Sequence, residues 1–161
     1  MSSTIPADRI QLVELAPKPF AAVLRLSQSI KLDETLHYLV ALRASQINGC
    51  AFCLDMHWKD LRAAGESEAR LYSLDAWRES PLYDERERAA LALTEAVTLI
   101  ADGHVPDDVW EQAASVFDQE ELANLVFAIA EINVWNRMNI TARVEPGHYD
   151  PSQRAGLGAS A

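Results

Sequence analysis

Apolar residues recur at helical spacing along most of this chain. Similar apolar stripes predict helices over residues 20–30, 34–47, 50–64, 67–76, 84–101, 106–116 and 118–141. No segment alternates apolar and polar residues over five positions with turn signals on both sides, so strands are not expected. The pattern therefore predicts an all-α fold of six to eight helices.

Residues that begin or end helices support these boundaries. Asp33 can cap the helix that begins at residue 34, because its side chain can accept a hydrogen bond from a free backbone N–H of the first turn. Asn48-Gly49 is a natural stop for that helix, since glycine adopts the left-handed conformation that often follows a helix. Gly65 supplies the next break. The chain is thus divided into helices joined by short turns.

The two ends of the chain differ in composition from its middle. Residues 1–19 contain three prolines and predict an extended lead-in with room for one short helical turn. Residues 146–161 are rich in Gly, Ser and Ala, which predicts a tail that is flexible or packs against a partner. Between them, residues 20–145 are expected to form a single helical domain, as the length of 161 residues and the hydrophobic content of 49% allow.

Charge and apolar content exclude several classes of function. With 24 acidic and 14 basic residues, the formal net charge is −10, which argues against binding to nucleic acid or to an anionic membrane. No apolar run approaches the length of about 18 residues that a membrane helix needs, and the first residues lack the features of a secretion signal. We therefore expect a cytoplasmic protein, where a cysteine pair is more often catalytic or metal-binding than structural.

The two cysteines of the chain form a Cys50-x-x-Cys53 pair, and His57 follows one helical turn later. At about 100° per residue, the three side chains share a helix sector of about 60°. In the first turn of a helix, unpaired backbone N–H groups and the helix dipole favour a thiolate. A thiolate can attack a peroxide or a disulfide, the second cysteine can trap the sulfenic acid, and His57 is placed to transfer the proton.

Two other interpretations of these residues remain open. The cysteines and His57 could bind zinc with His37, His104 or an acidic residue as the fourth ligand, although no second cysteine or histidine pair has ligand spacing. The two cysteines could also be buried and inert. No cofactor is expected, because the six glycines are scattered and form neither a phosphate-binding nor a dinucleotide-binding motif.

Glu131 stands out because apolar residues flank it within a predicted helix. A carboxylate in that setting is expected either to form a structural ion pair with Arg43, Arg137 or Arg143, or to take part in proton transfer.

The segment around the cysteine pair resembles a known family. Residues 42–57 are similar to the core signature of the AhpD-like alkylhydroperoxidases within the carboxymuconolactone decarboxylase family; they read Leu-Arg-Ala-Ser-Gln-Ile-Asn-Gly-Cys-Ala-Phe-Cys-Leu-Asp-Met-His. The resemblance extends over roughly residues 20–145 and includes residues 72–79, 85–90 and 132–137. It implies an AhpD-like helical bundle that assembles as a homo-oligomer, a trimer or a hexamer, with the site near a subunit interface.

The resemblance also implies roles for the site residues. Cys53 would attack the peroxide, Cys50 would resolve the sulfenic acid, and His57 would take part in a proton relay. A thiol or a lipoylated protein would supply the reducing equivalents.

One position departs from the family pattern. The glutamate that the peroxidases carry twelve residues before the first cysteine is Tyr38 in this chain. Because a phenol has an ordinary pKa of about 10, Tyr38 is a poor base at neutral pH, although it can donate a hydrogen bond within the relay. Glu34, one turn earlier, and Glu131 are the two residues that could replace the missing carboxylate.

Together these observations favour a thiol-dependent peroxidase that reduces hydroperoxides. The alternatives are a general disulfide reductase that uses the same pair, and a non-enzymatic redox-sensing or metal-binding helical oligomer. Lactone decarboxylation fits poorly, because the decarboxylase branch of the family generally lacks this cysteine pair.

Overall fold

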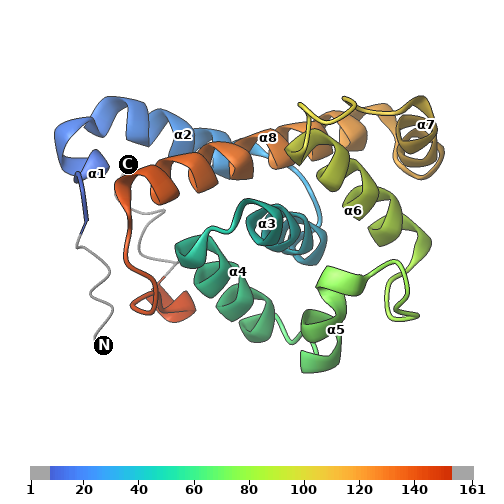
Figure 1. Ribbon diagram of the computed structural model, residues 1–161, viewed down its shortest axis with the longest axis horizontal. Coiled ribbons are helices and arrows are strands. Elements are labelled where there is room, and N and C mark those ends of the chain that lie inside the picture. Colours follow the sequence, from blue (N-terminus) through green and yellow to red (C-terminus); the bar gives the residue numbers. More distant parts are fainter. Residues whose placement is uncertain (1–7, 154–161) are drawn as a thin grey trace.

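Helices account for all the regular secondary structure of residues 8–153, the part of the chain that the computed structural model describes (Figure 1). The α-helices are α1 (Leu12–Leu15), α2 (Pro17–Ser29), α3 (Glu34–Asn48), α4 (Ala51–Ala63), α5 (Glu68–Ser73), α6 (Glu85–Thr98), α7 (Asp107–Val116) and α8 (Gln119–Ala142). Two short 3-10 helices, η1 and η2, cover Leu74–Ala76 and Pro151–Gln153. The prediction of a single all-α domain is confirmed. None of the helices in this range has the length and apolar character needed to cross a membrane.

Helix α3 lies at the centre of the molecule, with α8, α4 and α6 packed around it (Figure 1). Its side chains are buried on most sides, and Leu39, Val40 and Leu42 are completely covered. One core cluster joins α3 to α6, α7 and α8 and includes Leu36, Val40, Leu93, Leu125 and Ile129. A second joins α3 to α4, α5, η1 and α6 and includes Leu39, Leu42, Leu61, Leu74 and Leu91. The continuous apolar burial fixes the position of α3 between the other helices.

Acidic residues cap the starts of three long helices, α3, α6 and α8. The carboxylate of Asp33 accepts a hydrogen bond from the Leu36 N–H at the start of α3, at 3.0 Å. Asp84 and Asp118 form capping boxes with the glutamates three residues later, at the starts of α6 and α8. Each cap satisfies backbone donors that the first helical turn would otherwise leave unpaired. The predicted start of α3 after Asp33 is confirmed.

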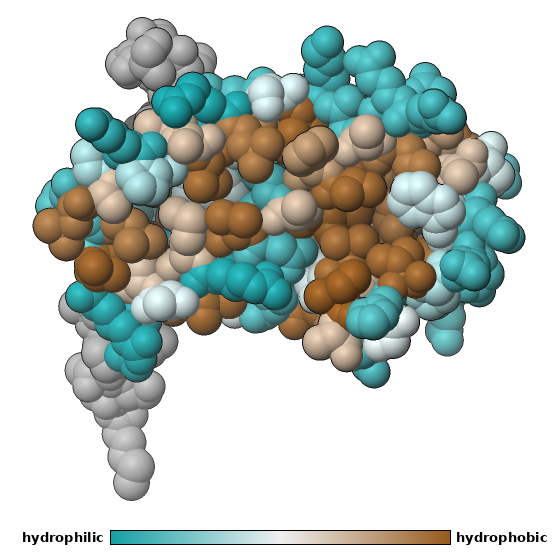
Figure 2. All heavy atoms as spheres, turned by 90° about the horizontal axis from the view of Figure 1, so that it is seen from above, coloured by the Kyte–Doolittle hydropathy of each residue, from teal (hydrophilic) through white to brown (hydrophobic). Residues whose placement is uncertain are grey.

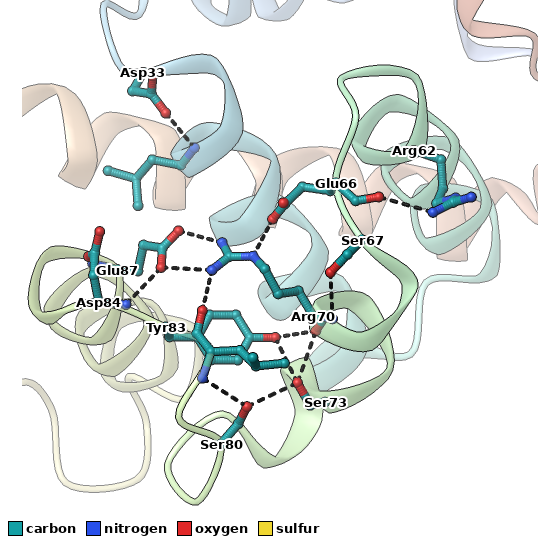
Figure 3. A network of polar contacts seen from close by, with 12 residues as sticks. Asp33, Arg62, Glu66, Ser67, Arg70, Ser73, Ser80, Tyr83, Asp84 and Glu87 are labelled. Atoms are coloured by element: carbon teal, nitrogen blue, oxygen red, sulfur yellow. Dashed lines mark hydrogen bonds and ion pairs between the residues drawn. The ribbon is translucent and has the colours of Figure 1, made fainter.

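A half-buried ion-pair network fastens α5 to α6. Figure 3 shows the Arg70 guanidinium between the carboxylates of Glu66 and Glu87, with the Tyr83 ring beside it. The Tyr83 hydroxyl in turn donates a hydrogen bond to the backbone carbonyl of Arg70. Because these groups come from both sides of the loop between the helices, they hold the α5–α6 connection against the second core cluster.

Several helix ends differ from the sequence prediction. Helix α2 begins at Pro17 rather than near Phe20, since proline is tolerated in the first turn, where its missing N–H would be unpaired anyway. The lead-in also contains α1, and its residues 1–7 lie outside the described part of the chain. The helix predicted over residues 67–76 is divided into α5 and η1, and α6 ends at Thr98 rather than at residue 101.

The described part of the tail packs against α4 of the same chain. The Lys59 ammonium donates hydrogen bonds to the backbone carbonyls of Gly147 and Tyr149, and the Gly147 N–H donates to the Asp55 carboxylate at 3.1 Å. At the other end of the chain, the Arg9 N–H donates to the carbonyl of Ala142 at 2.8 Å. The lead-in and the tail therefore meet near the C-terminal end of α8. Residues 154–161 of the predicted tail lie outside the described range.

Candidate active site

The loop between α3 and α4 brings the two sulfur atoms together. Gly49 ends α3 with a φ of +69°, in the left-handed region where glycine has no Cβ penalty, and this turn places Cys50 at the N-cap of α4. The Cys53 N–H donates to the Cys50 sulfur at 3.4 Å, as an N-cap side chain would accept it. The Cys50 thiol donates to the Cys53 sulfur at 2.7 Å. Both thiols are free and buried.

Polar side chains from α3 and α8 surround the Cys53 sulfur. The Asn139 amide donates to it at 3.3 Å. Behind it, the Asn136 amide donates to the Ser45 hydroxyl at 3.0 Å, and Asn48 donates to Asn136 at 2.8 Å. Sequence reasoning had not assigned a role to Ser45, Asn136 or Asn139. The signal that could have found two of them is a pair of asparagines one turn apart on the inward face of an apolar helix.

The two cysteines have different acidities. The pKa of Cys53 is lowered to about 7, chiefly by the hydrogen bond from Cys50 and also by the amides of Asn139 and Asn136, while burial acts in the opposite direction. The same interaction raises the pKa of Cys50 above its ordinary value, because Cys50 must keep its proton to donate it, and burial adds to this. Cys53 is therefore the sulfur that ionises first, and it is partly a thiolate near neutral pH while Cys50 keeps its proton. Thiol chemistry with a resolving cysteine requires this difference between the two sulfurs.

His57 lies one turn beyond Cys53 on α4, and it is neutral. Burial, together with the nearby His37, lowers its pKa to about 3. Neither ring nitrogen forms a hydrogen bond with any group in residues 8–153, although Nδ1 lies 3.9 Å from a carboxylate oxygen of Asp60. A neutral imidazole can pass a proton on by accepting at one nitrogen and releasing from the other, whereas the low pKa makes His57 a weak base.

Tyr38 and Glu34 lie beside His57, and Glu131 lies elsewhere. The Tyr38 ring centroid is 6.2 Å from that of His57, and the Tyr38 hydroxyl donates to the Glu34 carboxylate at 2.8 Å. Glu131 instead accepts hydrogen bonds from Ser27 and from the Trp135 indole. Cys50, Cys53 and His57 thus lie along the first half of α4, and Tyr38 lies beside His57. Glu34 joins them only through Tyr38, and Glu131 lies at the contact between α2 and α8.

The expected ion pair of Glu131 is not formed within residues 8–153. Arg43 pairs with Glu95 and Asp75 on the opposite side of α3. Burial raises the pKa of Glu131, and the hydrogen bonds from Ser27 and Trp135 only partly offset that effect. Trp135 also packs against the cluster that contains both cysteines, so the Glu131 contacts help to position one wall of the site.

A cavity of about 560 Å³ opens beside the sulfur pair. Cys50 and Asn139 line it, together with Phe52, Ile140, Arg143 and Val144. Another hollow of about 770 Å³ lies on the outer face of α4, between Trp58, Lys59 and Pro151, and includes neither cysteine. Of these two cavities, the first is the candidate substrate site, because Cys50 lines it together with Asn139, whose amide bonds to the Cys53 sulfur. Its volume is in the usual range for small-molecule sites.

Among the described residues, no group of three His, Cys, Asp or Glu side chains is arranged to hold a metal ion. The site as described therefore consists of two sulfurs, a neutral imidazole and the amides and hydroxyls around them.

Comparison with known proteins identifies relatives of this chain. The pattern of the carboxymuconolactone decarboxylase family matches residues 17–96. The uncharacterized protein YdfG of Bacillus subtilis is 39% identical over 137 residues, which cover 83% of this chain and 93% of YdfG.

Solved structures show the same arrangement of helices. A protein of unknown function from Agrobacterium tumefaciens, described as a candidate antioxidant defence protein AhpD, superimposes with a TM-score of 0.84 at 42% identity, over 88% of this chain and 99% of its own. A peroxidase-related protein with an alkylhydroperoxidase AhpD core from Ralstonia eutropha gives a TM-score of 0.73 at 18% identity, over 84% and 74% of the two chains. The second likeness concerns the fold alone.

Proposed function

We infer that this chain, which belongs to the carboxymuconolactone decarboxylase family as an AhpD-like member, is a thiol-dependent peroxidase that reduces hydroperoxides at Cys53. The observation that carries this inference is the paired state of the two sulfurs. Cys50 donates its thiol proton to Cys53 at 2.7 Å, and the pKa of Cys53 falls to about 7. A buried sulfur that ionises near neutral pH beside a protonated thiol is suited to attack a peroxide and then to close a disulfide.

The first step transfers one oxygen atom to Cys53. The thiolate attacks a peroxide oxygen, an S–O bond forms as the O–O bond breaks, and the leaving alkoxide takes up a proton and departs as an alcohol. Cys53 is oxidised to a sulfenic acid, and the peroxide is reduced. His57, one turn away and neutral, is placed to move the proton that the leaving oxygen needs.

The second step closes the disulfide. The Cys50 sulfur attacks the Cys53 sulfur, so that an S–S bond forms, the S–O bond breaks, and water leaves with the proton of Cys50. The sulfurs need to approach by only about 0.7 Å to reach bonding distance. A dithiol, such as the lipoyl group of a carrier protein, then returns two electrons and two protons and is itself oxidised to a disulfide. Both cysteines are thereby restored.

Tyr38 and Glu34 extend the relay in our proposal. The Tyr38 hydroxyl is bonded to the Glu34 carboxylate at 2.8 Å, and its ring lies beside His57. The pair supplies a carboxylate from one turn earlier on α3, through a phenol, in place of the glutamate that other peroxidases of the family carry. The contacts of Glu131 with Ser27 and Trp135 favour a structural role for that residue.

A stopped-flow experiment tests the proposed function. Reduced protein is mixed with cumene hydroperoxide, and the oxidation of Cys53 is followed through the loss of free thiol. We expect oxidation much faster than that of free cysteine, its loss in Cys53→Ser, and accumulation of a sulfenic acid in Cys50→Ser. Oxidation no faster than free cysteine would refute the peroxidase. If the same protein then exchanged rapidly with a small disulfide, the disulfide reductase would replace it.

We also propose that the protein is a homo-oligomer, a trimer or a hexamer. Figure 2 views the molecule from the side on which α2 and α8 lie, and apolar residues gather on this face. On α8, Phe127 and Val134 are exposed by 56% and 38% and lie two helical turns apart on one side. Light scattering of the purified protein gives the subunit number. A monomeric mass of the parent protein at working concentrations would refute the assembly. An oligomeric mass that Phe127→Glu leaves unchanged would refute the use of this face in it.

A further inference from the structure

Arg143 places in the wall of the cavity beside the sulfurs a guanidinium that has no bonded partner among the described residues. It is the C-cap of α8, in the left-handed conformation with φ of +58°, and it is only partly exposed. Its guanidinium forms no hydrogen bond and no ion pair with residues 8–153. The chain has a net charge of −10, so a single cation contributes little to its solubility. An unpaired guanidinium beside the cysteine pair is therefore better explained by a ligand that it binds.

Two acidic residues also line this cavity, and neither is paired with Arg143. Asp8 accepts a hydrogen bond from the Gln11 amide at 2.8 Å, and the exposed Glu145 carboxylate lies 3.9 Å from the ring of His148. The remaining wall between Arg143 and Cys50 is largely apolar. It is formed by Phe52, Ile140, Val144 and Pro146. The cavity thus combines a hydrophobic surface, an unpaired guanidinium and a wall that includes Cys50.

We propose that Arg143 binds the carboxylate of an organic molecule that reacts with the Cys50–Cys53 pair, while the carbon chain of that molecule packs on the apolar wall. This inference rests on the proposed function and names the class of substrate. A guanidinium suits the task because it presents two parallel donors to a carboxylate. The carboxylate belongs either to an acidic hydroperoxide or to an acidic dithiol reductant, and the two sources act in different half-reactions.

The first experiment separates these sources by matched pairs of substrates. Oxidation of reduced protein is compared for linoleic acid hydroperoxide and its methyl ester, which differ only in the charged group. Reduction of the disulfide form is compared for dihydrolipoic acid and its neutral amide. A charge-assisted hydrogen bond predicts a preference of about tenfold or more for the acid, in one half-reaction or the other. A preference in the first pair assigns the site to the oxidant, and one in the second pair assigns it to the reductant.

Variants of α8 test whether Arg143 causes the preference. Arg143→Gln should reduce the ratio between acid and neutral substrate to about one, and Arg143→Lys should retain part of it. The matched control is Arg137→Gln, on the same helix, because the Arg137 guanidinium bonds to Asn133 and does not line the cavity. The control should keep the ratio and the rates of the parent protein. Thermal melting of each variant separates loss of recognition from loss of folding.

A binding measurement keeps this inference independent of the peroxidase itself. Octanoate is titrated into the resting reduced protein by calorimetry, and Arg143→Gln should weaken its binding about tenfold relative to the Arg137→Gln control. If cumene hydroperoxide failed to oxidise Cys53 but octanoate binding depended on Arg143, the peroxidase proposal would be refuted and the carboxylate-binding site would be supported. Equal rates for acid and neutral substrates in both half-reactions, or binding unaffected by Arg143→Gln, would overturn the site.

Discussion

Replacing Asn139 by leucine removes the amide that donates to the Cys53 sulfur at 3.3 Å, and the reactivity of that sulfur should change in a calculable way. A hydrogen bond to a charged group contributes about 1.5–3 kcal/mol, and one pKa unit corresponds to about 1.4 kcal/mol. The pKa of Cys53, lowered to about 7 in the parent protein, should therefore rise by about one to two units in Asn139→Leu. Leucine has nearly the same shape as asparagine, so the cavity wall is kept.

The loss of thiolate and the gain in nucleophilicity act in opposite directions. At about pH 7 the ionised fraction of Cys53 should fall from about one half to between about a tenth and a hundredth. A thiolate of higher pKa is intrinsically more nucleophilic, by about threefold per unit. The net rate at about pH 7 should therefore fall only about two- to sixfold. Well above both pKa values, the variant should react faster than the parent.

Alkylation of Cys53 by iodoacetamide across a range of pH measures this effect, with mass spectrometry to identify the modified cysteine. The small neutral reagent avoids any change in substrate binding. Arg137→Gln, two residues earlier on α8, serves as the control and should follow the parent profile. The two profiles of parent and Asn139→Leu should cross between about pH 7 and about pH 10. Superimposable profiles would show that the amide does not stabilise the thiolate, and the account of Cys53 activation would be wrong.

Three further predictions concern groups that support the site. In Cys50→Ser, the sulfenic acid of Cys53 is no longer trapped as a disulfide, so repeated peroxide exposure should drive it to the sulfinic acid, seen by mass spectrometry; over-oxidation no faster than in the parent protein would argue against Cys50 as the resolving group. Burial raises the pKa of Glu131, so its contribution to stability is present in acid and lost as the pH rises through that pKa. Glu131→Gln should therefore gain melting temperature relative to the parent between about pH 4 and about pH 7, and a constant difference would contradict this. The Tyr149 hydroxyl donates to the buried Asp60 carboxylate at 2.6 Å. Tyr149→Phe should therefore lower the free energy of unfolding by about 1–3 kcal/mol near neutral pH. The loss should be smaller in acid, because the raised pKa of Asp60 leaves its carboxyl group protonated there. Chemical denaturation of the parent protein and of Tyr149→Phe at neutral and acidic pH measures this difference. Equal stability of the two proteins at both pH values would show that the tail does not stabilise Asp60.

The helices themselves could be predicted from the sequence because their causes are local. The apolar stripe of α3, the cap at Asp33 and the stop at Gly49 act within a few residues, and all three are found where the sequence placed them. The differences occur where several local preferences compete. Pro17 was expected to delay α2, but proline fits its first turn, and α5 passes into a 3-10 helix as the chain bends toward Trp77.

The candidate site likewise combines residues whose proximity is local, and so predictable from the sequence, with residues that only the tertiary structure brings together. Cys50, Cys53 and His57 share one face of α4 because their spacing is helical, so their proximity followed from the sequence. The groups that adjust their chemistry come from other helices and from the tail. Asn139 reaches Cys53 from α8, and Asp60 is held by Tyr149 across 89 residues of chain. No periodic pattern in the sequence predicts a contact between residues so far apart in the chain.

By itself, the sequence determined that the protein is a helical bundle with two thiols and an imidazole at the start of one helix, because backbone hydrogen bonding and side-chain period are local properties. Only the tertiary structure decided which sulfur is ionised, that Tyr38 is paired with Glu34, and that Glu131 is bound to Ser27 and Trp135. Those outcomes depend on burial and on hydrogen bonds between helices far apart in the chain. Both are set by the packing of the core around α3.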